Sequence, residues 1–269
     1  MENDAVHIVH LDRDHPGFRD PVYRARRNQI AAIALQHRRG QAVRRVDYTA
    51  AEHEVWRTAA RELGPLHAEL ACREFLAEYA GLGLPGTSVP QLEDLNARIA
   101  AATGFRFEPV AGLVTPSEFM THLADGVFLA TQYLRHGSTP LYTPEPDVIH
   151  EIIGHAPLLM APRFAALNRL FGEAARGADE ARTQALIRLY WYTLEFGLVR
   201  EAGALKVVGA GLFSSFGELR RLAQVPQRPL VIDEIVATDF DPTDYQRVYF
   251  VADGTDELLA TVAAWLRRG

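Results

Sequence analysis

The sequence predicts a mostly α-helical protein with a small β element, folded as a single domain. Helix-start signals recur along the chain, each an Asp or Thr placed before a proline or three residues before a glutamate. Strand patterns are few and fall in the C-terminal third. No repeat, low-complexity stretch or shift in composition marks a linker, and 269 residues suit one large domain.

The composition excludes several classes of protein. Hydrophobic residues make up 48% and charged residues 23%, as in an ordinary globular chain. The net charge of −6 argues against nucleic-acid binding, which requires clustered Lys and Arg. No apolar run approaches the roughly 20 residues of a membrane span, and the N-terminus lacks the pattern of a signal peptide. With one cysteine, Cys72, we expect a cytoplasmic, monomeric protein without nucleic-acid or membrane partners.

The elements can be predicted in order along the chain. We expect residues 1–19 to form a polar N-terminal arm and residues 20–269 to form one domain, with no separate regulatory domain. Asp20-Pro21 predicts a helix start, and Gly64-Pro65 is expected to kink or split the second helix. The expected helices are 21–40, 49–70, 90–102, 115–133, 147–156, 162–176, 179–199 and 256–268. The expected strands are 204–208, 229–236 and 247–251, and the expected binding loops are 104–114 and 135–146.

Two histidines and a glutamate lie within six residues of an otherwise apolar segment. His150 and His155 are five residues apart, which is not the four-residue spacing of the HExxH zinc proteases. On a regular helix this spacing separates the two side chains by roughly 140°. Both can therefore bind one metal only if the helix is distorted or one of them stands at its end, and Gly154 permits such a distortion. The alternative is two unrelated helical histidines.

A third candidate ligand, Glu195, lies on an apolar helix face. That face comprises Ile187, Tyr190, Trp191, Leu194 and Leu198. A buried carboxylate is costly unless it is paired or binds a metal, so the alternative is an ion pair with Arg188 or Arg200. Two imidazoles and one carboxylate form the facial triad of non-haem Fe(II) oxygenases, although Zn²⁺ uses the same ligand types.

Two further segments offer groups for a ligand. Prolines make the loop 135–146 rigid, and Arg135 at its start could bind a substrate carboxylate through two parallel hydrogen bonds. The alternative is an arginine that stabilises a helix C-terminus. The small residues of 209–218 allow close approach of the backbone to a ligand, or a simple strand-to-helix turn.

Together these segments resemble the pterin-dependent aromatic amino acid hydroxylases, most closely the bacterial-type phenylalanine hydroxylases. The matching strings are PVAGLVTPSEF, TQYLRHGSTPLYTPEPDVIHEIIGHAPL, RLYWYTLEFGLV, VVGAGLFSSFGEL and YQRVYFVAD. The resemblance covers about residues 103–268, with a weaker match near the N-terminus. It implies a mostly helical catalytic domain with Fe(II), a tetrahydropterin co-substrate and O₂.

The resemblance also implies a role for individual residues. The iron ligands would be His150, His155 and Glu195. The pterin would contact Val114, Phe119, Glu151 and Tyr190, of which Glu151 and Tyr190 would also contribute to catalysis. The amino acid substrate would contact Arg135, Thr143, Pro146, Trp191 and Ser214, with Arg135 on its carboxylate.

The substrate and the reaction class have alternatives. Trp191 resembles the phenylalanine- and tyrosine-hydroxylating members, and Pro242 stands near the place where tyrosine-specific members carry an Asp. The resemblance therefore favours phenylalanine, converted to tyrosine. Meta-hydroxylation of phenylalanine, or hydroxylation of tyrosine or tryptophan, would use the same machinery. A different class, a zinc hydrolase, would use the same ligands with Glu151 as general base. A catalytically inactive binding protein is the third hypothesis, against which the intact set of candidate residues argues.

Overall fold

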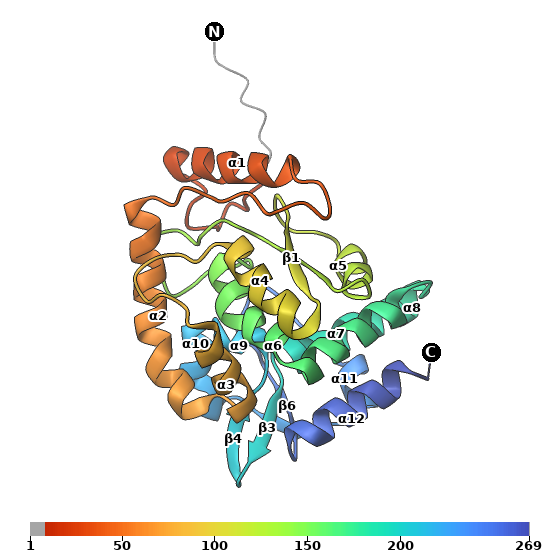
Figure 1. Ribbon diagram of the computed structural model, residues 1–269. Coiled ribbons are helices and arrows are strands. Elements are labelled where there is room, and N and C mark those ends of the chain that lie inside the picture. Colours follow the sequence, from red (N-terminus) through yellow and green to blue (C-terminus); the bar gives the residue numbers. More distant parts are fainter. Residues whose placement is uncertain (1–8, 269) are drawn as a thin grey trace.

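The computed structural model describes residues 9–268 and confirms a mostly helical domain (Figure 1). The helices, with π- and 3₁₀-segments marked η, are α1 Pro21–Leu35, α2 Ala50–Leu70, α3 Arg73–Leu82, α4 Leu92–Thr103, α5 Pro116–Leu123, η1 His150–His155, α6 Ala156–Met160, α7 Pro162–Ala175, α8 Glu180–Tyr190, η2 Trp191–Glu195, α9 Ala210–Phe213, α10 Phe216–Arg221, η3 Leu222–Gln224, α11 Ile232–Ala237 and α12 Thr255–Leu266.

The β structure consists of two small sheets. The strands are β1 Arg106–Pro109, β2 Val127–Ala130, β3 Leu198–Glu201, β4 Ala204–Val207, β5 Gln227–Pro229 and β6 Tyr249–Ala252. Strands β1 and β2 form a parallel pair. The other sheet has the order β4-β3-β6-β5, in which only the β3–β4 pair is antiparallel.

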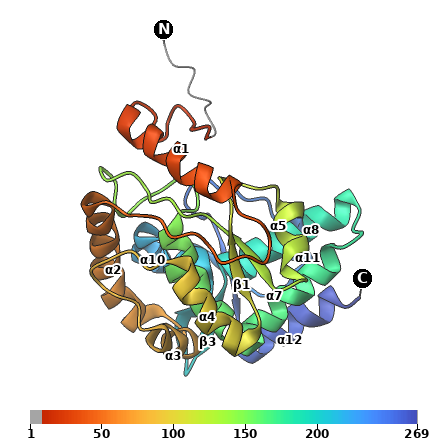
Figure 2. The same ribbon diagram turned by 45° about the horizontal axis from the view of Figure 1, so that its top comes forward.

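The helices surround η1, α6 and α9, which lie in the middle of the molecule (Figure 1). Helix α1 crosses one end, as the turned view in Figure 2 shows, and α12 lies at the opposite end. The core is rich in aromatic side chains from distant segments, among them Trp56, Phe75, Phe128, Phe171 and Phe250. Among the described residues, no helix is long and apolar enough to span a membrane.

Three helix starts form as their capping signals predict. The Asp20 side chain accepts hydrogen bonds from two amides of α1, Thr49 makes a complete capping box, and Thr115 accepts from the amide of Glu118. Helix α1 ends at Leu35 rather than near residue 40, so its expected end was wrong. The expected split of the second helix was also wrong, because α2 continues through Pro65, which is solvent-exposed together with Arg61. The Arg61 carbonyl, which proline leaves without a helical partner, belongs to this exposed part of the helix.

The prediction that the helix beginning at residue 115 continues to residue 133 was wrong. Helix α5 ends at Leu123, and Gly126 takes a left-handed conformation with φ of 71°. The next four residues form β2, whose side chains are all buried, beside β1 in the expected loop 104–114. A short continuous apolar run fits a strand buried on both faces as well as a helix, and pairing with β1 decided between them.

Two predictions in the C-terminal third were also wrong. The helix expected to reach residue 199 ends at Glu195, and Leu198 and Val199 belong to β3, where they pair with β4 and β6. The strand expected over 229–236 is the end of β5 followed by α11. Asp233 and Glu234 lie in the first turn of α11, where acidic side chains favour a helix.

Candidate active site

Two of the predicted metal ligands stand at the two ends of one π-helix. Segment η1 begins at His150 and ends at His155, and the amide of Ala156 donates to the carbonyl of Glu151. This i→i+5 hydrogen bonding brings side chains five residues apart onto one face of the helix. It is the distortion that the five-residue spacing required.

The third predicted ligand, Glu195, ends a second π-helix. In η2 the amide of Phe196 donates to the carbonyl of Trp191 over 2.8 Å. Glu195 Oε1 lies 3.1 Å from His155 Nε2, and Glu195 Oε2 lies 3.7 Å from His150 Nε2. The two Nε2 atoms are 2.8 Å apart. The structure thus brings the three predicted side chains together around one point.

The charges at this point suit a cation. Burial lowers the pKa of His150 to about 4, which keeps its imidazole neutral at physiological pH. Burial raises the pKa of Glu195, but His155 and His150 outweigh it, so that the pKa is lowered and the carboxylate is ionised. Burial lowers the pKa of His155, but the charge of Glu195 outweighs it and raises the pKa overall. Metal binding requires a deprotonated nitrogen on His155, so a bound cation would counteract this rise.

Ser214 lies on the far side of His150. The resemblance predicted a substrate contact for this residue, and the structure brings its Oγ within 2.9 Å of His150 Nδ1. The Ser214 hydroxyl also lies 3.2 Å from the carbonyl oxygen of Ala210, to which it can donate. The hydroxyl oxygen then accepts from Nδ1–H, which leaves the Nε2 lone pair of His150 free for a metal.

Gly154 allows α9 to pack against η1. A Cβ atom at this position would lie 2.6 Å from the backbone oxygen of Ala210. We expect Gly154→Ala to lower the free energy of unfolding by about 1–3 kcal/mol, because a backbone contact cannot yield as a flexible side chain does. Urea unfolding measures this change. The control is Gly64→Ala on the exposed side of α2, where nothing lies within 4 Å and alanine should stabilise the helix. Equal stability of wild type and Gly154→Ala would contradict the close packing.

A second carboxylate, Glu151, lies close to both histidines. One ligand atom from each of His150, Glu151 and His155 lies within 4.8 Å of the others. The amide and the hydroxyl of Thr131 both donate to Glu151 Oε1, at 3.0 and 3.1 Å. Burial raises the pKa of Glu151 to about 7. Glu151 is therefore held by Thr131, whereas the carboxylate of Glu195 contacts the imidazoles directly, so Glu195 is the better placed of the two carboxylates for the predicted third ligand.

Arg135 is held in a buried ion pair that sequence reasoning missed. Its Nε and Nη2 donate to the two oxygens of Asp147, each over 2.9 Å, and the Asp147 side chain is fully buried. Asp147 also accepts from the amide of His150. Because Arg135 follows β2 rather than a helix, the helix-terminus interpretation was wrong. The pair leaves the Nη1 edge of the guanidinium for a second acceptor. An aspartate inside the apolar run before His150 was the available signal.

Aromatic rings connect the predicted pterin residues to the histidines. Phe119, half-buried on α5, makes edge contacts with Phe128 at 5.0 Å and with Tyr190 at 5.6 Å between ring centroids. Phe128 in turn lies 4.4 Å from the ring of His155. The Tyr190 hydroxyl donates to Asn168 Oδ1 over 2.9 Å, so its ring rather than its hydroxyl lines this region. Val114 is half-buried in the segment before α5.

The remaining predicted substrate residues belong to two segments, η2 and the loop 135–146. Trp191 begins η2, and its indole Nε1 donates to Gln246 Oε1 over 2.8 Å. The Thr143 hydroxyl donates to the carbonyl of Glu145 within its own loop. Pro146 is exposed, and its carbonyl accepts from the Tyr133 hydroxyl over 2.6 Å. Contacts of these residues with a substrate stay a prediction.

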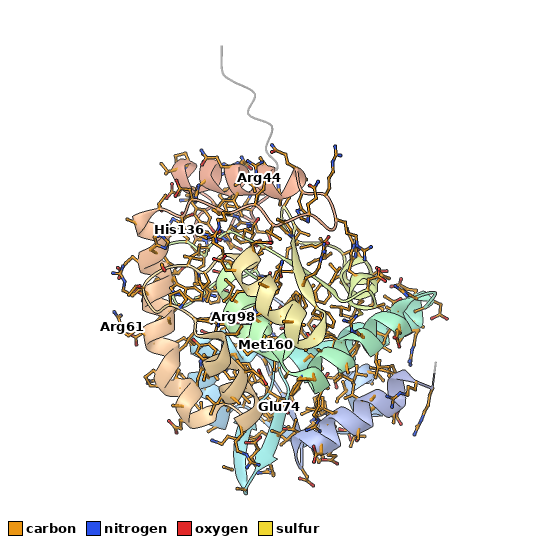
Figure 3. All side chains as sticks on the ribbon, viewed as in Figure 1. Arg44, Arg61, Glu74, Arg98, His136 and Met160 are labelled. Atoms are coloured by element: carbon orange, nitrogen blue, oxygen red, sulfur yellow. The ribbon has the colours of Figure 1, made fainter. Side chains whose placement is uncertain are left out.

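The loop 135–146 is tied to α1. His136, labelled in Figure 3, has its Nε2 3.1 Å from the carboxylate of Asp20, which caps α1. The buried Arg27 donates to Glu145 over 2.6 Å, and its guanidinium lies 3.2 Å from the centroid of the Tyr133 ring. These contacts hold the loop that carries Arg135 into the histidine segment.

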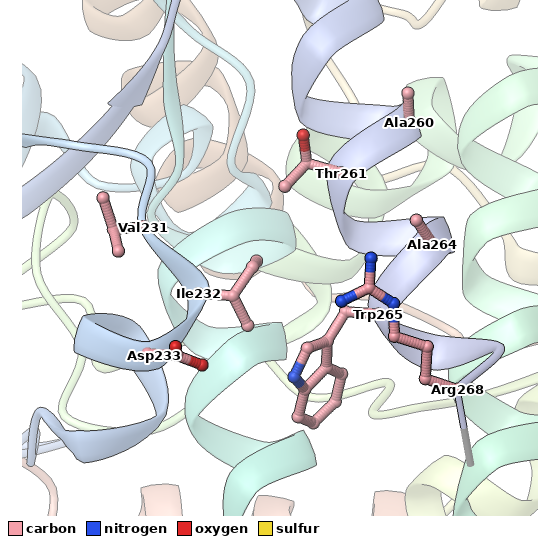
Figure 4. A pocket seen from close by; sticks show the side chains of 8 residues that line it. All are labelled: Val231, Ile232, Asp233, Ala260, Thr261, Ala264, Trp265 and Arg268. Carbon is pink, nitrogen blue, oxygen red and sulfur yellow. The ribbon is translucent and has the colours of Figure 1, made fainter.

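A surface groove between α11 and α12 contributes none of these residues. Figure 4 shows that its lining side chains include Ile232, Thr261 and Trp265, and its volume is about 440 Å³. The convergence of imidazoles, carboxylates and the Arg135 guanidinium therefore identifies the candidate site, rather than this groove.

The sequence matches a known protein family. A family model described as biopterin-dependent aromatic amino acid hydroxylase matches residues 5–268. The chain belongs to this family. Among curated relatives in this hydroxylase family, the phenylalanine-4-hydroxylase of Rattus norvegicus is 44% identical, over 96% of this chain and 59% of that protein. The tyrosine 3-monooxygenase of Schistosoma mansoni is 41% identical, over 92% of this chain and 55% of that protein. The chain thus spans a little over half the length of these relatives.

Solved structures of the family agree with the fold. The phenylalanine hydroxylase of Chromobacterium violaceum with bound oxidized Fe(III) is 31% identical and superimposes with a TM-score of 0.79 over 90% of each chain. A second structure of that enzyme, with bound iron(III) and oxidized cofactor 7,8-dihydrobiopterin, is 33% identical, with a TM-score of 0.76 over 82% of each chain. The prediction of a single hydroxylase-type catalytic fold is confirmed.

Proposed function

We propose that this protein hydroxylates the ring of a free aromatic amino acid, with L-phenylalanine as substrate and L-tyrosine as product. The observation that carries the proposal is the convergence of His150, His155 and Glu195 in a chain of this family. Fe(II) would be the metal and a tetrahydropterin the co-substrate. With O₂, they supply the oxidising chemistry that the amino acid side chains lack.

The residues present fit such a metal. One neutral imidazole, a second that binds a metal through its deprotonated nitrogen, and an ionised carboxylate provide three ligands and leave positions open. Ser214 orients the ring of His150, as residues beside a metal ligand commonly do. The relative from C. violaceum with bound Fe(III) supports the choice of iron.

The other predicted residues would divide between the two organic ligands. Phe119, Val114 and Tyr190 would contact the pterin, and Glu151, held by Thr131, would lie beside it. Arg135, oriented by Asp147, would bind the carboxylate of the amino acid. The protein would thereby hold the substrate ring near the metal and exclude water.

Tyrosine, tryptophan and a meta-hydroxylated product are the competing outcomes. Curated relatives include both phenylalanine-4-hydroxylases and tyrosine 3-monooxygenases. Family membership argues against the zinc hydrolase, whose ligand set would be the same. The deciding test is anaerobic loading with Fe(II) or Zn²⁺, followed by turnover of each aromatic amino acid with a tetrahydropterin and separation of products by ring position. We expect tyrosine from phenylalanine when the protein is loaded with Fe(II), and no product when it is loaded with Zn²⁺. The absence of a hydroxylated amino acid in every arm would overturn the proposal.

Ser214→Ala should weaken iron binding without unfolding the protein. The variant removes the acceptor of His150 Nδ1–H, and loss of such a partner typically lowers metal affinity about 10- to 100-fold. Titration with Fe(II) against a competing chelator measures the affinity. The matched control is Ser215→Ala, which removes the neighbouring hydroxyl that caps α10 and should lower stability but not iron affinity. Unchanged affinity in Ser214→Ala would refute the orienting role.

A further inference from the structure

The indole of Trp191 is fixed in orientation by one amide. Its Nε1–H donates to Gln246 Oε1 over 2.8 Å, and since an indole nitrogen only donates, the amide oxygen must face it. The indole stacks on Phe240, with ring centroids 4.2 Å apart and planes 13° from parallel. Phe196 lies 4.6 Å away on a tilted plane. Rotation of the indole would break both the hydrogen bond and the stack.

Gln246 is itself held by a buried carboxylate. The backbone N–H of Gln246 donates to Glu218 Oε1 over 2.7 Å, and the other oxygen of Glu218 accepts from the Tyr249 hydroxyl. Gln246, Glu218 and Tyr249 are each at most 4% exposed. The backbone of Gln246 is therefore held by the core, and its side-chain amide nitrogen also donates to the carbonyl of Asp244 over 3.4 Å.

This network lies beside the candidate site. Trp191 begins η2 and Glu195 ends it, so the held indole and the candidate ligand share one short segment. Trp191 is only partly buried, which leaves part of its ring uncovered by protein. The Tyr142 hydroxyl of the 135–146 loop reaches the carbonyl of Thr243 at 3.4 Å. The loop that carries Arg135 thus meets the loop that leads to Gln246.

We infer that Gln246 is a positioning residue that determines substrate specificity. It sets the tilt of the Trp191 indole, which forms the wall against which the substrate ring would lie. The inference rests on the proposed function. Arg135 would hold the carboxylate of the amino acid, so the wall decides which ring size fits between that anchor and the metal. We expect the indole held by Gln246 to accommodate a single six-membered ring. Without the hydrogen bond the indole can swing and admit the larger two-ring side chain of tryptophan.

Gln246→Met tests the inference, because it keeps the length of the side chain and removes the acceptor. We expect the ratio of kcat/KM for phenylalanine to that for tryptophan to fall about 10-fold, the size expected for one buried hydrogen bond. Phenylalanine binding to the iron-loaded protein without pterin, measured by calorimetry, should weaken as well. Trp191→Phe, which removes the donor instead, should shift the ratio too. Adding Gln246→Met to Trp191→Phe should then change the ratio no further.

Tyr192→Phe is the matched control. The Tyr192 hydroxyl donates to the carbonyl of Asp239, so this variant loses a hydrogen bond to the segment that carries Phe240 but keeps the hydrogen bond between the indole and Gln246. Its selectivity should equal that of wild type. An unchanged ratio in Gln246→Met, additive effects in the double variant, or an equal shift in Tyr192→Phe would overturn the inference. Failure of the proposed function is separate, since wild type would then hydroxylate none of the aromatic amino acids.

Discussion

Glu195→Gln should yield a folded protein that binds little iron and forms little hydroxylated product. The substitution keeps the side-chain volume but removes the negative charge that faces His155 and His150. Two imidazoles alone are expected to hold Fe(II) weakly. A ligand that binds only the folded state at 100 times its Kd stabilises it by about 2.7 kcal/mol. Iron should therefore raise the Tm of wild type clearly and that of the variant much less.

Elemental analysis for iron, together with thermal melts with and without Fe(II), measures both effects. The matched control is Glu201→Gln on β3, which makes the same chemical change where the carboxylate pairs with Arg73. It should leave the iron content unchanged. If Glu195→Gln binds iron and hydroxylates like wild type, Glu195 is a structural partner of the histidines and the ligand assignment is wrong.

Arg135→Lys should weaken amino acid binding far more than pterin binding. The guanidinium already uses two donors on Asp147, and only its planar fork has a second edge for a substrate carboxylate. A lysine ammonium can pair with Asp147 but cannot present that edge. Loss of a buried charge-assisted pair costs a few kcal/mol, so we expect the KM for the amino acid to rise by roughly 10- to 1,000-fold.

Steady-state kinetics with either substrate varied separates the two constants, and the KM for the pterin is the internal control. Arg163→Lys, at a solvent-exposed ion pair with Asp256, controls for the substitution itself. A thermal melt checks that the buried pair with Asp147 still folds. An unchanged KM for the amino acid would mean that Arg135 serves only to hold Asp147.

Local signals identified the helix starts and the chemistry of the site. Capping by Asp20, Thr49 and Thr115 depends on residues within one turn, so the sequence contains all that it requires. The five-residue spacing of His150 and His155 likewise required a distorted helix if both were to bind one metal. The π-helix met that requirement.

Long-range pairing decided what local signals left ambiguous. The apolar run of β2 became a strand because β1 lies beside it, and Leu198 left its expected helix to join a sheet with β4 and β6. Strand β6 is distant along the chain from Leu198, and β1 and β2 are separated by the whole of α5, whereas β3 and β4 form a hairpin. A short apolar run fits a helix or a buried strand equally well.

By itself, the sequence determined the kinds of residue available for chemistry, the signals that begin several helices, and the resemblance that the family match confirmed. The tertiary structure alone decided which groups face one another. It paired Arg135 with Asp147, turned Ser214 toward His150, and attached Trp191 to Gln246. Buried polar groups need a partner, but that partner is set by how the backbone packs in three dimensions, which no local spacing specifies.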